Sequence, residues 1–264
     1  MKIGFIGCGN MAKAIIQGIL EKGLVKPEDI TASDKLEEVI DAAKQKFFIN
    51  GTTSNVEVVT GADVIVLAVK PQFLEGAITE IRDNVSEKQL IISIAAGKTM
   101  AWLDEQFGKE VKLVRCMPNV AALVGEAMTS VSCNSLVTEE EQKTACELIG
   151  SFGRYEVVPE SLMDAVIAVS GSSPAYVFMF IEAMADAAVA EGMPRGQAYQ
   201  FAAQAVLGSA KMVLETGKHP GELKDMVCSP AGTTIAAVKV LEEKGFRSAV
   251  IEAMEACAKK NRSL

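Results

Sequence analysis

A glycine-rich turn close to the amino terminus has the residue types that hold a diphosphate group. It follows a short apolar run at Ile3–Ile6, reads G-x-G-x-x-A over residues 7–12 and opens into an apolar-periodic segment. The first glycine permits a tight turn, the second lets a diphosphate approach the backbone, and the alanine keeps helix and strand close together. Unpaired amides at the start of the helix favour an anion. The sequence therefore predicts a dinucleotide site at Ile6, Gly7, Cys8, Gly9, Asn10, Met11 and Ala12.

Ser33, Asp34 and Lys35 follow the second apolar run, in the neighbourhood where a dinucleotide site places its ribose-binding residue. A carboxylate there accepts a hydrogen bond from the ribose 2′-hydroxyl, whereas an adjacent cation attracts a 2′-phosphate. These residues therefore leave both NADPH (NADP) and NADH (NAD) open as the cofactor. Asp34 and Lys35 could instead be ordinary solvated turn residues.

Three further segments end apolar runs in small or turn-forming residues, and they are candidates for the rest of the cleft. Ligands of open α/β sheets bind at the carboxyl ends of the strands, where strand order reverses. Lys70 and Arg115 could equally serve on the surface or in ion pairs. The cofactor residues predicted in these segments are Ala68, Val69, Lys70, Pro71, Ala95, Ala96, Gly97, Met117, Pro118 and Asn119.

Toward the carboxyl end, a second turn precedes an apolar-periodic segment. Residues 229–234 read Ser-Pro-Ala-Gly-Thr-Thr. Several unpaired N–H groups at a helix start, together with the positive end of the helix dipole, can bind an anion without a basic side chain. Ser229 or Thr233 could also act as an ordinary N-cap, a local role that is compatible with ligand binding.

The elements that must position these residues are strands and helices in alternation. The run at residues 64–69 is apolar without alternation, as in a parallel strand that is buried on both faces. Thr138 and Glu141 form a capping-box pattern that opens a helix toward Gly150. This rhythm predicts a doubly wound α/β sheet. The expected strands are Ile3–Ile6, Ile30–Ser33, 64–69, 90–95, 111–115, 128–133 and 154–158.

Beyond Pro159 the β-branched runs stop, and residues that lose little rotamer freedom in helices take over. The sequence predicts a dinucleotide-binding domain at residues 1–159 and an all-α domain of four or five helices at residues 160–264. The expected breaks between these helices are at residues 171–174, 192–194, 217–221 and 229–232.

The segment 175–190 is apolar around most of its circumference, so burial on all sides is expected, and we infer a subunit interface. The alternative is the central helix of a monomeric bundle. The most apolar run within it is interrupted by Glu182 and Asp186, well short of the roughly 20 apolar residues that a membrane span requires. We therefore expect no membrane partner.

Composition excludes other classes of partner. The 264 residues include 26 Lys and Arg against 34 Asp and Glu, a formal net charge of −8, so the chain is not suited to neutralising nucleic-acid phosphates. The six cysteines are scattered without a C-x-x-C pair, and His219 is the only histidine, so no metal site and no disulfide framework are expected. Reduced thiols and the lack of a visible export signal predict a cytoplasmic protein.

The turn at residues 229–234 lies within a longer run, residues 220–242, that closely resembles the signature of pyrroline-5-carboxylate reductases. The resemblance implies a Rossmann domain followed by a helical dimerisation domain. Each active site would form between the cofactor cleft of one subunit and helices of its partner, so a homodimer or larger homo-oligomer is expected. The resemblance extends over the chain in family order at residues 7–12, 68–71, 93–97, 117–119 and 171–176.

The resemblance also implies roles for single residues in the cofactor site. Asn55 would touch the adenosine ribose, and Asn119 would lie near the nicotinamide. Val69, Lys70 and Pro71 would border the nicotinamide ribose. One departure from the family pattern lies next to this set, because Val120 and Ala121 stand where many relatives have a Thr-Pro pair.

For the substrate, the resemblance implies that the turn at residues 229–234 holds a carboxylate. Thr234 would lie near the ring nitrogen and is the catalytic candidate. Ala231 is a second departure, because many relatives have glycine there. The substrate-binding residues implied are Ser229, Ala231, Gly232, Thr233 and Thr234.

The activity implied is hydride transfer from NAD(P)H to C5 of 1-pyrroline-5-carboxylate, which gives L-proline. A protonated imine is already electrophilic, which explains why no His or paired carboxylates occur in the motifs. Holding the reacting carbons together can contribute roughly 7 to 11 kcal/mol of barrier reduction. His219 lies among Lys218, Pro220 and Gly221 and is expected in a surface turn.

Two other functions are compatible with a dinucleotide fold. A β-hydroxyacid dehydrogenase would carry a catalytic lysine on the long helix after the sheet, and residues 175–190 contain no lysine. A non-catalytic protein that senses the redox state of the dinucleotide is the other alternative.

Overall fold

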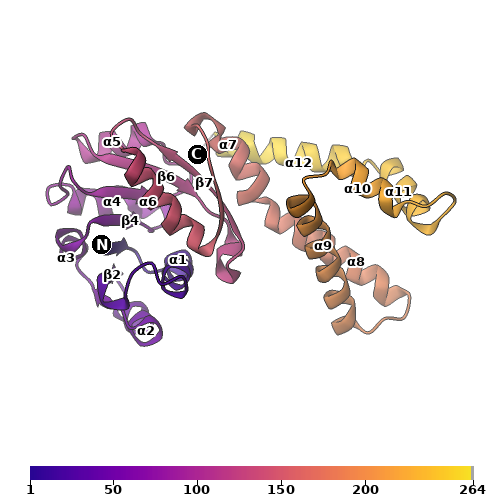
Figure 1. Ribbon diagram of the computed structural model, residues 1–264, viewed down its shortest axis with the longest axis horizontal. Coiled ribbons are helices and arrows are strands. Elements are labelled where there is room, and N and C mark those ends of the chain that lie inside the picture. The colour runs from indigo at the N-terminus through magenta and orange to yellow at the C-terminus, as the bar shows by residue number, and fades with distance from the viewer. Residues whose placement is uncertain (263–264) are drawn as a thin grey trace. The chain divides into compact units, whose positions relative to one another are not determined.

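The computed structural model describes residues 1–262, and its contacts divide the chain into two compact units. The first unit comprises Met1–Gly171 and the chain from Ala258 onward, and the second comprises Ser172–Cys257 (Figure 1). The first unit holds the sheet, and the second is helical.

The first unit is built on an eight-stranded sheet in the order β3-β2-β1-β4-β5-β6-β7-β8. Its strands from β1 to β6 are parallel, β7 is antiparallel to β6, and β8 is parallel to β7. The order 3-2-1-4-5-6 is that of the doubly wound dinucleotide fold, so the predicted fold class is confirmed. The strands are β1 (Ile3–Ile6), β2 (Ile30–Ser33), β3 (Asn50–Thr52), β4 (Val64–Leu67), β5 (Leu90–Ser93), β6 (Lys112–Met117), β7 (Ala127–Cys133) and β8 (Gly153–Val157).

Helices cover both faces of this sheet, and alternate residues of one strand enter different cores. Phe5 packs with α1, α2 and α6, whereas Ile6, its neighbour, packs with α3, α4 and α5. Two-sided burial is the reason that β4 reads as a continuous apolar run. The helices of this unit are α1 (Asn10–Glu21), α2 (Glu37–Phe47), α3 (Asn55–Gly61), α4 (Pro71–Ile81), α5 (Met100–Phe107), α6 (Glu139–Ile149) and α7 (Met163–Val166), with 3-10 turns η1 (Pro27–Asp29), η2 (Val120–Val124), η3 (Gly150–Phe152) and η4 (Glu160–Leu162) and a π-helical turn η5 (Ile167–Gly171).

Every strand expected from the sequence is present, with bounds that shift by up to two residues. The capping box at Thr138 and Glu141 is also confirmed at the start of α6. The sequence did not predict β3, a three-residue strand without a large apolar side chain. Its Gly51 fits beneath α2, because a Cβ there would lie 2.4 Å from Ile40 Cγ2.

The second unit consists of helices separated at the predicted breaks. One further break, at Gly245, was not predicted. Gly245 has a φ of 73° and separates α11 from α12. The helices are α8 (Ser173–Ala190), α9 (Arg195–Thr216), α10 (Pro220–Val227), α11 (Thr233–Glu243) and α12 (Phe246–Asn261).

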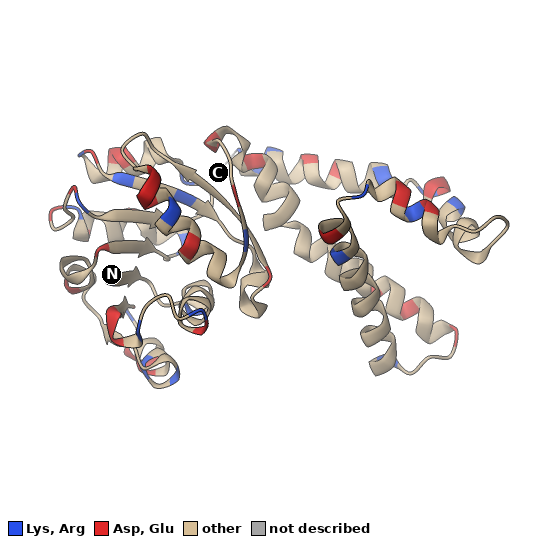
Figure 2. Ribbon diagram, in the orientation of Figure 1, with Lys and Arg blue, Asp and Glu red and all other residues tan. Residues whose placement is uncertain are grey.

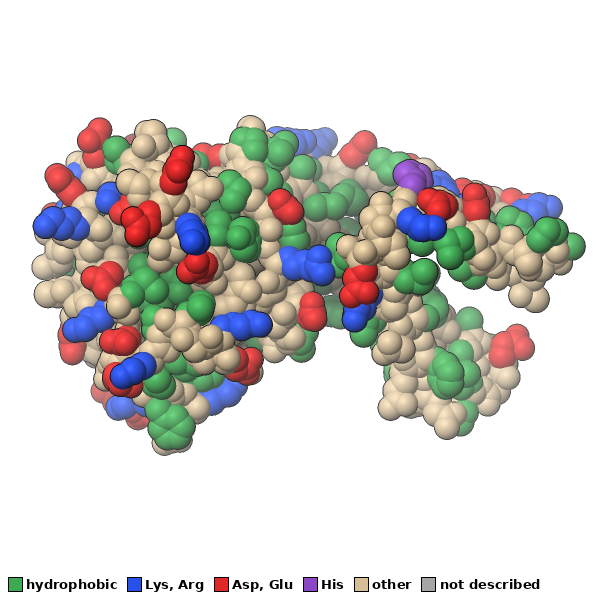
Figure 3. Space-filling model, viewed as in Figure 1, with side chains coloured by type: hydrophobic (Ala, Val, Ile, Leu, Met, Phe, Trp, Pro, Cys, Tyr) green, Lys and Arg blue, Asp and Glu red, His purple; other side chains and the backbone are tan. Residues whose placement is uncertain are grey.

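Helix α8 is not buried on all sides within the chain. Its side chains Phe178 and Met179 are 62% and 68% exposed, and of its residues only Ala185 is fully buried. Figure 2 shows few charges along α8 and α9, and Figure 3 shows hydrophobic side chains reaching the surface of the helical unit. The alternative of a central helix in a monomeric bundle is therefore wrong, because such a helix would be covered by its own chain.

The helical stretch Glu160–Ala190 is long and apolar enough to cross a membrane when judged by length and composition alone, and 17% of its most apolar window is buried. Such a stretch occurs once within residues 1–262.

Candidate functional site

The first candidate site lies where the strand order reverses, at the carboxyl ends of β1 and β4. The Ala68 N–H donates to the Ile6 carbonyl (2.8 Å), and the Gly7 N–H donates to the Ser33 carbonyl (2.9 Å). Gly7 has a φ of 94°, and a Cβ on it would lie 2.8 Å from Val69 Cγ1. This position therefore requires glycine for its backbone angle and for space. The geometry brings together residues that the sequence placed in three separate segments.

Gly9 requires a different explanation. Its φ is −73°, which any residue adopts, and a Cβ added there would meet no described atom within 4 Å. Neither the backbone nor the packing of the chain itself calls for glycine. A ligand that closely approaches the α-carbon would require glycine at this position, as expected for a diphosphate.

Helix α1 begins directly after Gly9. No side chain in the described part of the chain caps its first turn, and no acidic residue lies in that turn. Its amino-terminal amides and dipole therefore suit an anion. Cys8, in the turn itself, is fully buried, and burial raises the pKa of its thiol, so it stays protonated at neutral pH. The turn can bind a diphosphate, and it offers no nucleophile.

Asp34 is tied to the glycine-rich turn. The Cys8 N–H donates to Asp34 Oδ2 (3.0 Å), and the Leu36 N–H donates to Asp34 Oδ1 (3.2 Å). Asp34 is therefore a turn residue that also contacts the glycine-rich turn, and its role toward the ribose stays a prediction. Lys35 is exposed beside it.

Asn55, at the first position of α3, lies beside the end of β2. The buried Ser33 hydroxyl donates to Asn55 Oδ1 (2.6 Å), and Asn55 Nδ2 donates to Glu80 Oε2 on α4 (2.8 Å). Glu80 could not be predicted from the sequence, because no motif surrounds it and only its bond to Asn55 distinguishes it.

The segments after β4 and β5 lie side by side, since the Ile94 N–H donates to the Leu67 carbonyl (3.2 Å). After β4, Ala68 and Val69 are half-buried, Lys70 is exposed, and Pro71 starts α4. After β5, Ala95 is buried, Ala96 and Gly97 are half-buried, and Gly97 has a φ of 73° with open space beside it.

Arg115 serves in an ion pair. It is 6% exposed, and its Nη1 donates to Glu160 Oε1 (2.7 Å), which also accepts the Met100 N–H (2.8 Å). The sequence left open whether Arg115 lies on the surface or forms an ion pair, and the structure shows an ion pair. Sequence reasoning missed Glu160, because the two residues are 45 positions apart and neither belongs to a spaced motif.

Met117 to Asn119 lie against the π-helical turn. Asn119 Nδ2 donates to the Ser170 carbonyl (3.0 Å), and Asn119 Oδ1 accepts the Met128 N–H (3.3 Å). A Cβ on Gly171 would lie 3.3 Å from Met117 Cε. The Asn119 amide thus links the end of β6 to the start of β7, and it keeps one N–H and acceptor capacity for a ligand.

The second candidate site is the turn before α11. Gly232 is the N-cap, and no side chain in the described part of the chain caps this helix, so the expected N-capping by Ser229 or Thr233 is wrong. The Gly232 N–H donates to the Ser229 carbonyl (3.1 Å), and Ala231 adopts a φ of 58°. Ser229, Ala231 and Thr233 are exposed, and Thr234 is half-buried. An uncapped helix start without acidic residues in its first turn suits an anion such as a carboxylate.

The two sites lie in different units of the chain. The cofactor candidates belong to the first unit, and residues 229–234 belong to the second.

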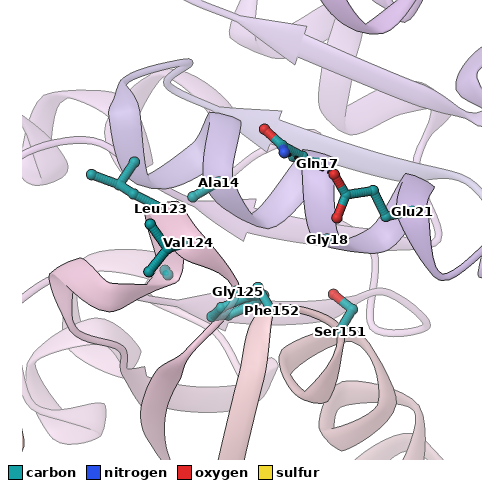
Figure 4. Close-up of a pocket in the computed structure, with 10 residues that line it drawn as sticks. Ala14, Gln17, Gly18, Glu21, Leu123, Val124, Gly125, Ser151 and Phe152 are labelled. Carbon is teal, nitrogen blue, oxygen red and sulfur yellow. Dashed lines mark hydrogen bonds between the residues drawn. The ribbon is translucent and has the colours of Figure 1, made fainter. Parts of the chain in front are cut away.

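A pocket of about 280 Å³ lies between α1, η2 and η3 (Figure 4). Gln17 and Glu21 of α1 line it together with Leu123 and Val124 of η2. Gln17 Nε2 donates to Glu21 Oε1 (2.8 Å), so these polar groups already satisfy each other. None of the predicted site residues lines this pocket, and we do not assign the chemistry to it.

His219 is the N-cap of α10, and its Nδ1 accepts the Gly221 N–H (3.0 Å). It is exposed, as the surface-turn prediction requires. Within residues 1–262, no three His, Cys, Asp or Glu side chains gather closely enough to hold a metal ion.

Two family models match the chain. Residues 160–264 match pyrroline-5-carboxylate reductase dimerisation, and residues 2–97 match NADP oxidoreductase, coenzyme F420-dependent. The chain is 55% identical over 263 residues to the pyrroline-5-carboxylate reductase of Escherichia coli K12, covering 100% of this chain and 98% of the relative. It is 46% identical to the enzyme of Methanosarcina acetivorans, covering 100% and 97%.

Solved structures agree with the sequence relatives. A pyrroline-5-carboxylate reductase from Coxiella burnetii superposes with a TM-score of 0.94 at 35% identity, covering 99% of this chain and 97% of that one. The Plasmodium falciparum pyrroline carboxylate reductase with NADP bound superposes with a TM-score of 0.89 at 33% identity, covering 100% and 97%. The apolar stretch Glu160–Ala190 lies within the region that matches the dimerisation model, so its exposed surface is accounted for by subunit pairing.

Proposed function

The chain belongs to the pyrroline-5-carboxylate reductase family, and we propose that two of its turns hold the reactants. Residues 7–12 would bind the diphosphate of the cofactor, and residues 229–234 the carboxylate of the substrate. The reaction is the reduction of 1-pyrroline-5-carboxylate to L-proline, with NAD(P)H supplying the hydride, so the protein is an oxidoreductase.

The observation that carries the cofactor assignment is Gly9. Nothing in the chain itself calls for glycine there, and it stands directly before an uncapped helix start. A diphosphate fits both features, because it needs close access to the backbone and unpaired N–H groups. We extend the cofactor site to Ser33, Asp34 and Asn55 at the ribose end, because Asp34 is hydrogen-bonded to the turn and Asn55 is hydrogen-bonded to the neighbouring Ser33.

The segments after β4, β5 and β6 would form the nicotinamide end of the same site. They end neighbouring strands of one parallel sheet, and small residues such as Ala95 and Gly97 leave room for a ring. Arg115 is left out of this set, because Glu160 occupies its guanidinium.

Thr234 is proposed to lie near the ring nitrogen of the substrate. The turn before α11 offers backbone amides to the substrate carboxylate, and a protonated imine needs no further acid to become electrophilic. These residues would therefore act mainly by holding the two reacting carbons in place, which contributes roughly 7 to 11 kcal/mol.

The decisive assay is loss of the near-ultraviolet absorbance of reduced nicotinamide after addition of 1-pyrroline-5-carboxylate. In this assay Thr234→Ala should lower kcat/KM for the imine by about tenfold or more, because an oriented hydrogen bond to a charged group is lost. Cofactor binding should be retained. The matched control is Thr144→Ala, which removes a half-buried helical threonine hydroxyl of the first unit. Wild-type kinetics in Thr234→Ala would contradict the proposed role of Thr234 near the ring nitrogen. Loss of activity in His219→Gln would contradict a mechanism that uses no histidine.

Neither alternative function is favoured. A β-hydroxyacid dehydrogenase would ignore the imine, and a redox sensor would bind the cofactor without turnover. The relatives named as pyrroline-5-carboxylate reductases cover the whole chain, from bacteria to plants.

The protein is a homo-oligomer, as its dimerisation region requires. We propose that each active site combines one subunit's cofactor turn with its partner's helices, and that the functional division falls between residues 159 and 160. The start of the dimerisation match at residue 160 supports this boundary, although the contacts of the single chain divide it between Gly171 and Ser172. We further propose a cytoplasmic location, in keeping with six free cysteines.

A further inference from the structure

A chain of three polar side chains runs outward from the sheet beside the predicted cofactor site. The buried Ser33 hydroxyl donates to Asn55 Oδ1 (2.6 Å), and Asn55 Nδ2 donates to Glu80 Oε2 (2.8 Å). Ser33 ends β2, Asn55 starts α3, and Glu80 is the penultimate residue of α4. Three elements that are separate in sequence are thus joined through one amide group.

This arrangement fixes the orientation of the Asn55 amide. A carboxylate accepts but does not donate, so Glu80 requires the N–H side of the amide, and the Ser33 hydroxyl meets the oxygen side. One N–H and acceptor capacity on the oxygen remain for a ligand. Without Glu80, the amide would lose the partner that selects this orientation.

The end of β2 is the place where a doubly wound sheet of this strand order receives the adenosine ribose. Asp34 follows Ser33 there and accepts the N–H of Cys8 in the glycine-rich turn. The Ser33–Asn55–Glu80 chain is therefore connected to the same strand end as the diphosphate turn. The hydrogen bonds at this strand end include two negatively charged carboxylates, those of Asp34 and Glu80. One positively charged side chain, the exposed Lys35, follows Asp34 in the sequence.

We propose that Glu80 is a positioning and specificity-determining residue for the cofactor: it holds the Asn55 amide for the ribose hydroxyls, and its carboxylate disfavours a 2′-phosphate. This inference rests on the proposed cofactor site. A negative charge close to the 2′ position repels a phosphate but not a hydroxyl. The carboxylate is therefore expected to weaken the binding of NADPH and not that of NADH.

Two substitutions separate the roles of Glu80. Glu80→Gln keeps an acceptor for Asn55 and removes the charge, whereas Glu80→Ala removes both. Glu75→Gln is the matched control, because it removes one carboxylate from an exposed position of the same helix that takes no part in the Ser33–Asn55–Glu80 hydrogen bonds. For each protein, kcat and KM are measured with NADH and with NADPH at saturating imine, at low and high ionic strength, and cofactor binding is measured by fluorescence.

In Glu80→Gln we expect the ratio of kcat/KM for NADPH to that for NADH to rise about threefold to tenfold at low salt, and the rise to shrink at high salt. In Glu80→Ala we expect KM for NADH to rise about threefold to tenfold with kcat nearly unchanged, since a net hydrogen bond to a positioned amide is lost.

If the ratio of kcat/KM for NADPH to kcat/KM for NADH is the same in Glu80→Gln and Glu75→Gln, the specificity role is overturned. An unchanged KM for NADH in Glu80→Ala would overturn the positioning role. Both outcomes require a wild-type protein that reduces the imine. A wild-type protein that binds both cofactors but turns over neither would instead contradict the proposed function, so the two failures are distinguishable.

Discussion

Ala231, in the turn before α11, has a strained backbone conformation. Its φ of 58° lies in the left-handed region, where a Cβ crowds the following carbonyl group. Ala231 lies between Pro230 and Gly232, and the Gly232 N–H closes the turn on the Ser229 carbonyl (3.1 Å). The chain has alanine at this position and therefore bears the steric cost of the left-handed conformation.

Replacing Ala231 by glycine should therefore stabilise the protein by about 1 kcal/mol, because the steric cost of the left-handed conformation disappears. Part of this gain is offset by the greater freedom of glycine in the unfolded chain. Thermal denaturation followed by circular dichroism measures the change. A lower melting temperature in Ala231→Gly would show that the turn does not strain the alanine. The KM for the imine in the same variant reports whether the turn keeps its shape.

At the scale of elements, α6 is tied to the sheet through its first turn. The Thr138 side chain accepts the Glu141 N–H, and Glu141 Oε2 accepts the Thr138 N–H (3.0 Å). Glu141 Oε1 also meets Lys112 Nζ of β6 (2.5 Å). Burial alone would raise the pKa of Glu141, but the hydrogen bonds from Lys112 and Thr138 outweigh burial and lower it.

A lowered pKa in the folded state predicts a defined pH dependence. The stabilisation by ionised Glu141 is complete above the carboxyl's ordinary pKa of 4.5 and is lost as the pH falls through its lower folded value. Glu141→Gln should cost about 1 kcal/mol at neutral pH. That cost should vanish in acid, which urea denaturation of both proteins between about pH 3 and 7 would test. A difference that is independent of pH would contradict the charge-based explanation.

The ion pair of Arg115 and Glu160 connects β6 to η4, and Glu160 also accepts the amide of Met100 at the start of α5. Glu160→Ala should cost about 3 kcal/mol, because it leaves a buried guanidinium without its partner. The double substitution Arg115→Met with Glu160→Leu should recover most of this loss, since it removes both charges. Free energies of unfolding in urea measure both effects. If the double variant is as unstable as Glu160→Ala, the unpaired charge is not the cause.

At the scale of the whole molecule, the helical unit exposes the apolar residues that an isolated domain would bury. Phe178 and Met179 on α8 are accompanied by exposed Phe201, Leu214 and Ile251 on α9 and α12. Apolar area of this extent is stable in water when a second copy covers it. Folding of the second unit and assembly are therefore expected to be coupled.

A charge placed on α8 should disrupt this assembly. We expect Phe178→Glu to shift the protein from oligomer to monomer and to lower its melting temperature, because a buried carboxylate without a partner is costly. Sedimentation velocity measures the change. Phe48→Glu is the matched control, since Phe48 is 79% exposed on the first unit. An oligomer that survives Phe178→Glu unchanged would exclude α8 from the interface.

The fold class and the position of both turns could be predicted from the residues alone. These depend on local signals: the apolar period of strands buried on both faces, the glycine pattern of residues 7–12, the capping box at Thr138, and the breaks that end the helices. The sequence also predicted the helical second half, because helix propensity and the lack of β-branched runs are local properties.

The hydrogen-bond and ion-pair partners of those residues became visible in the folded chain. Asp34 accepts the amide of Cys8, Asn55 joins Ser33 to Glu80, and Arg115 is neutralised by Glu160, each across 22 or more positions of chain. The structure also showed that α8 remains uncovered by its own chain. Such pairings depend on how strands and helices stack, and no periodicity or spacing encodes them. The short strand β3 escaped prediction for the same reason, since its residues are held by the neighbouring strand and not by propensity.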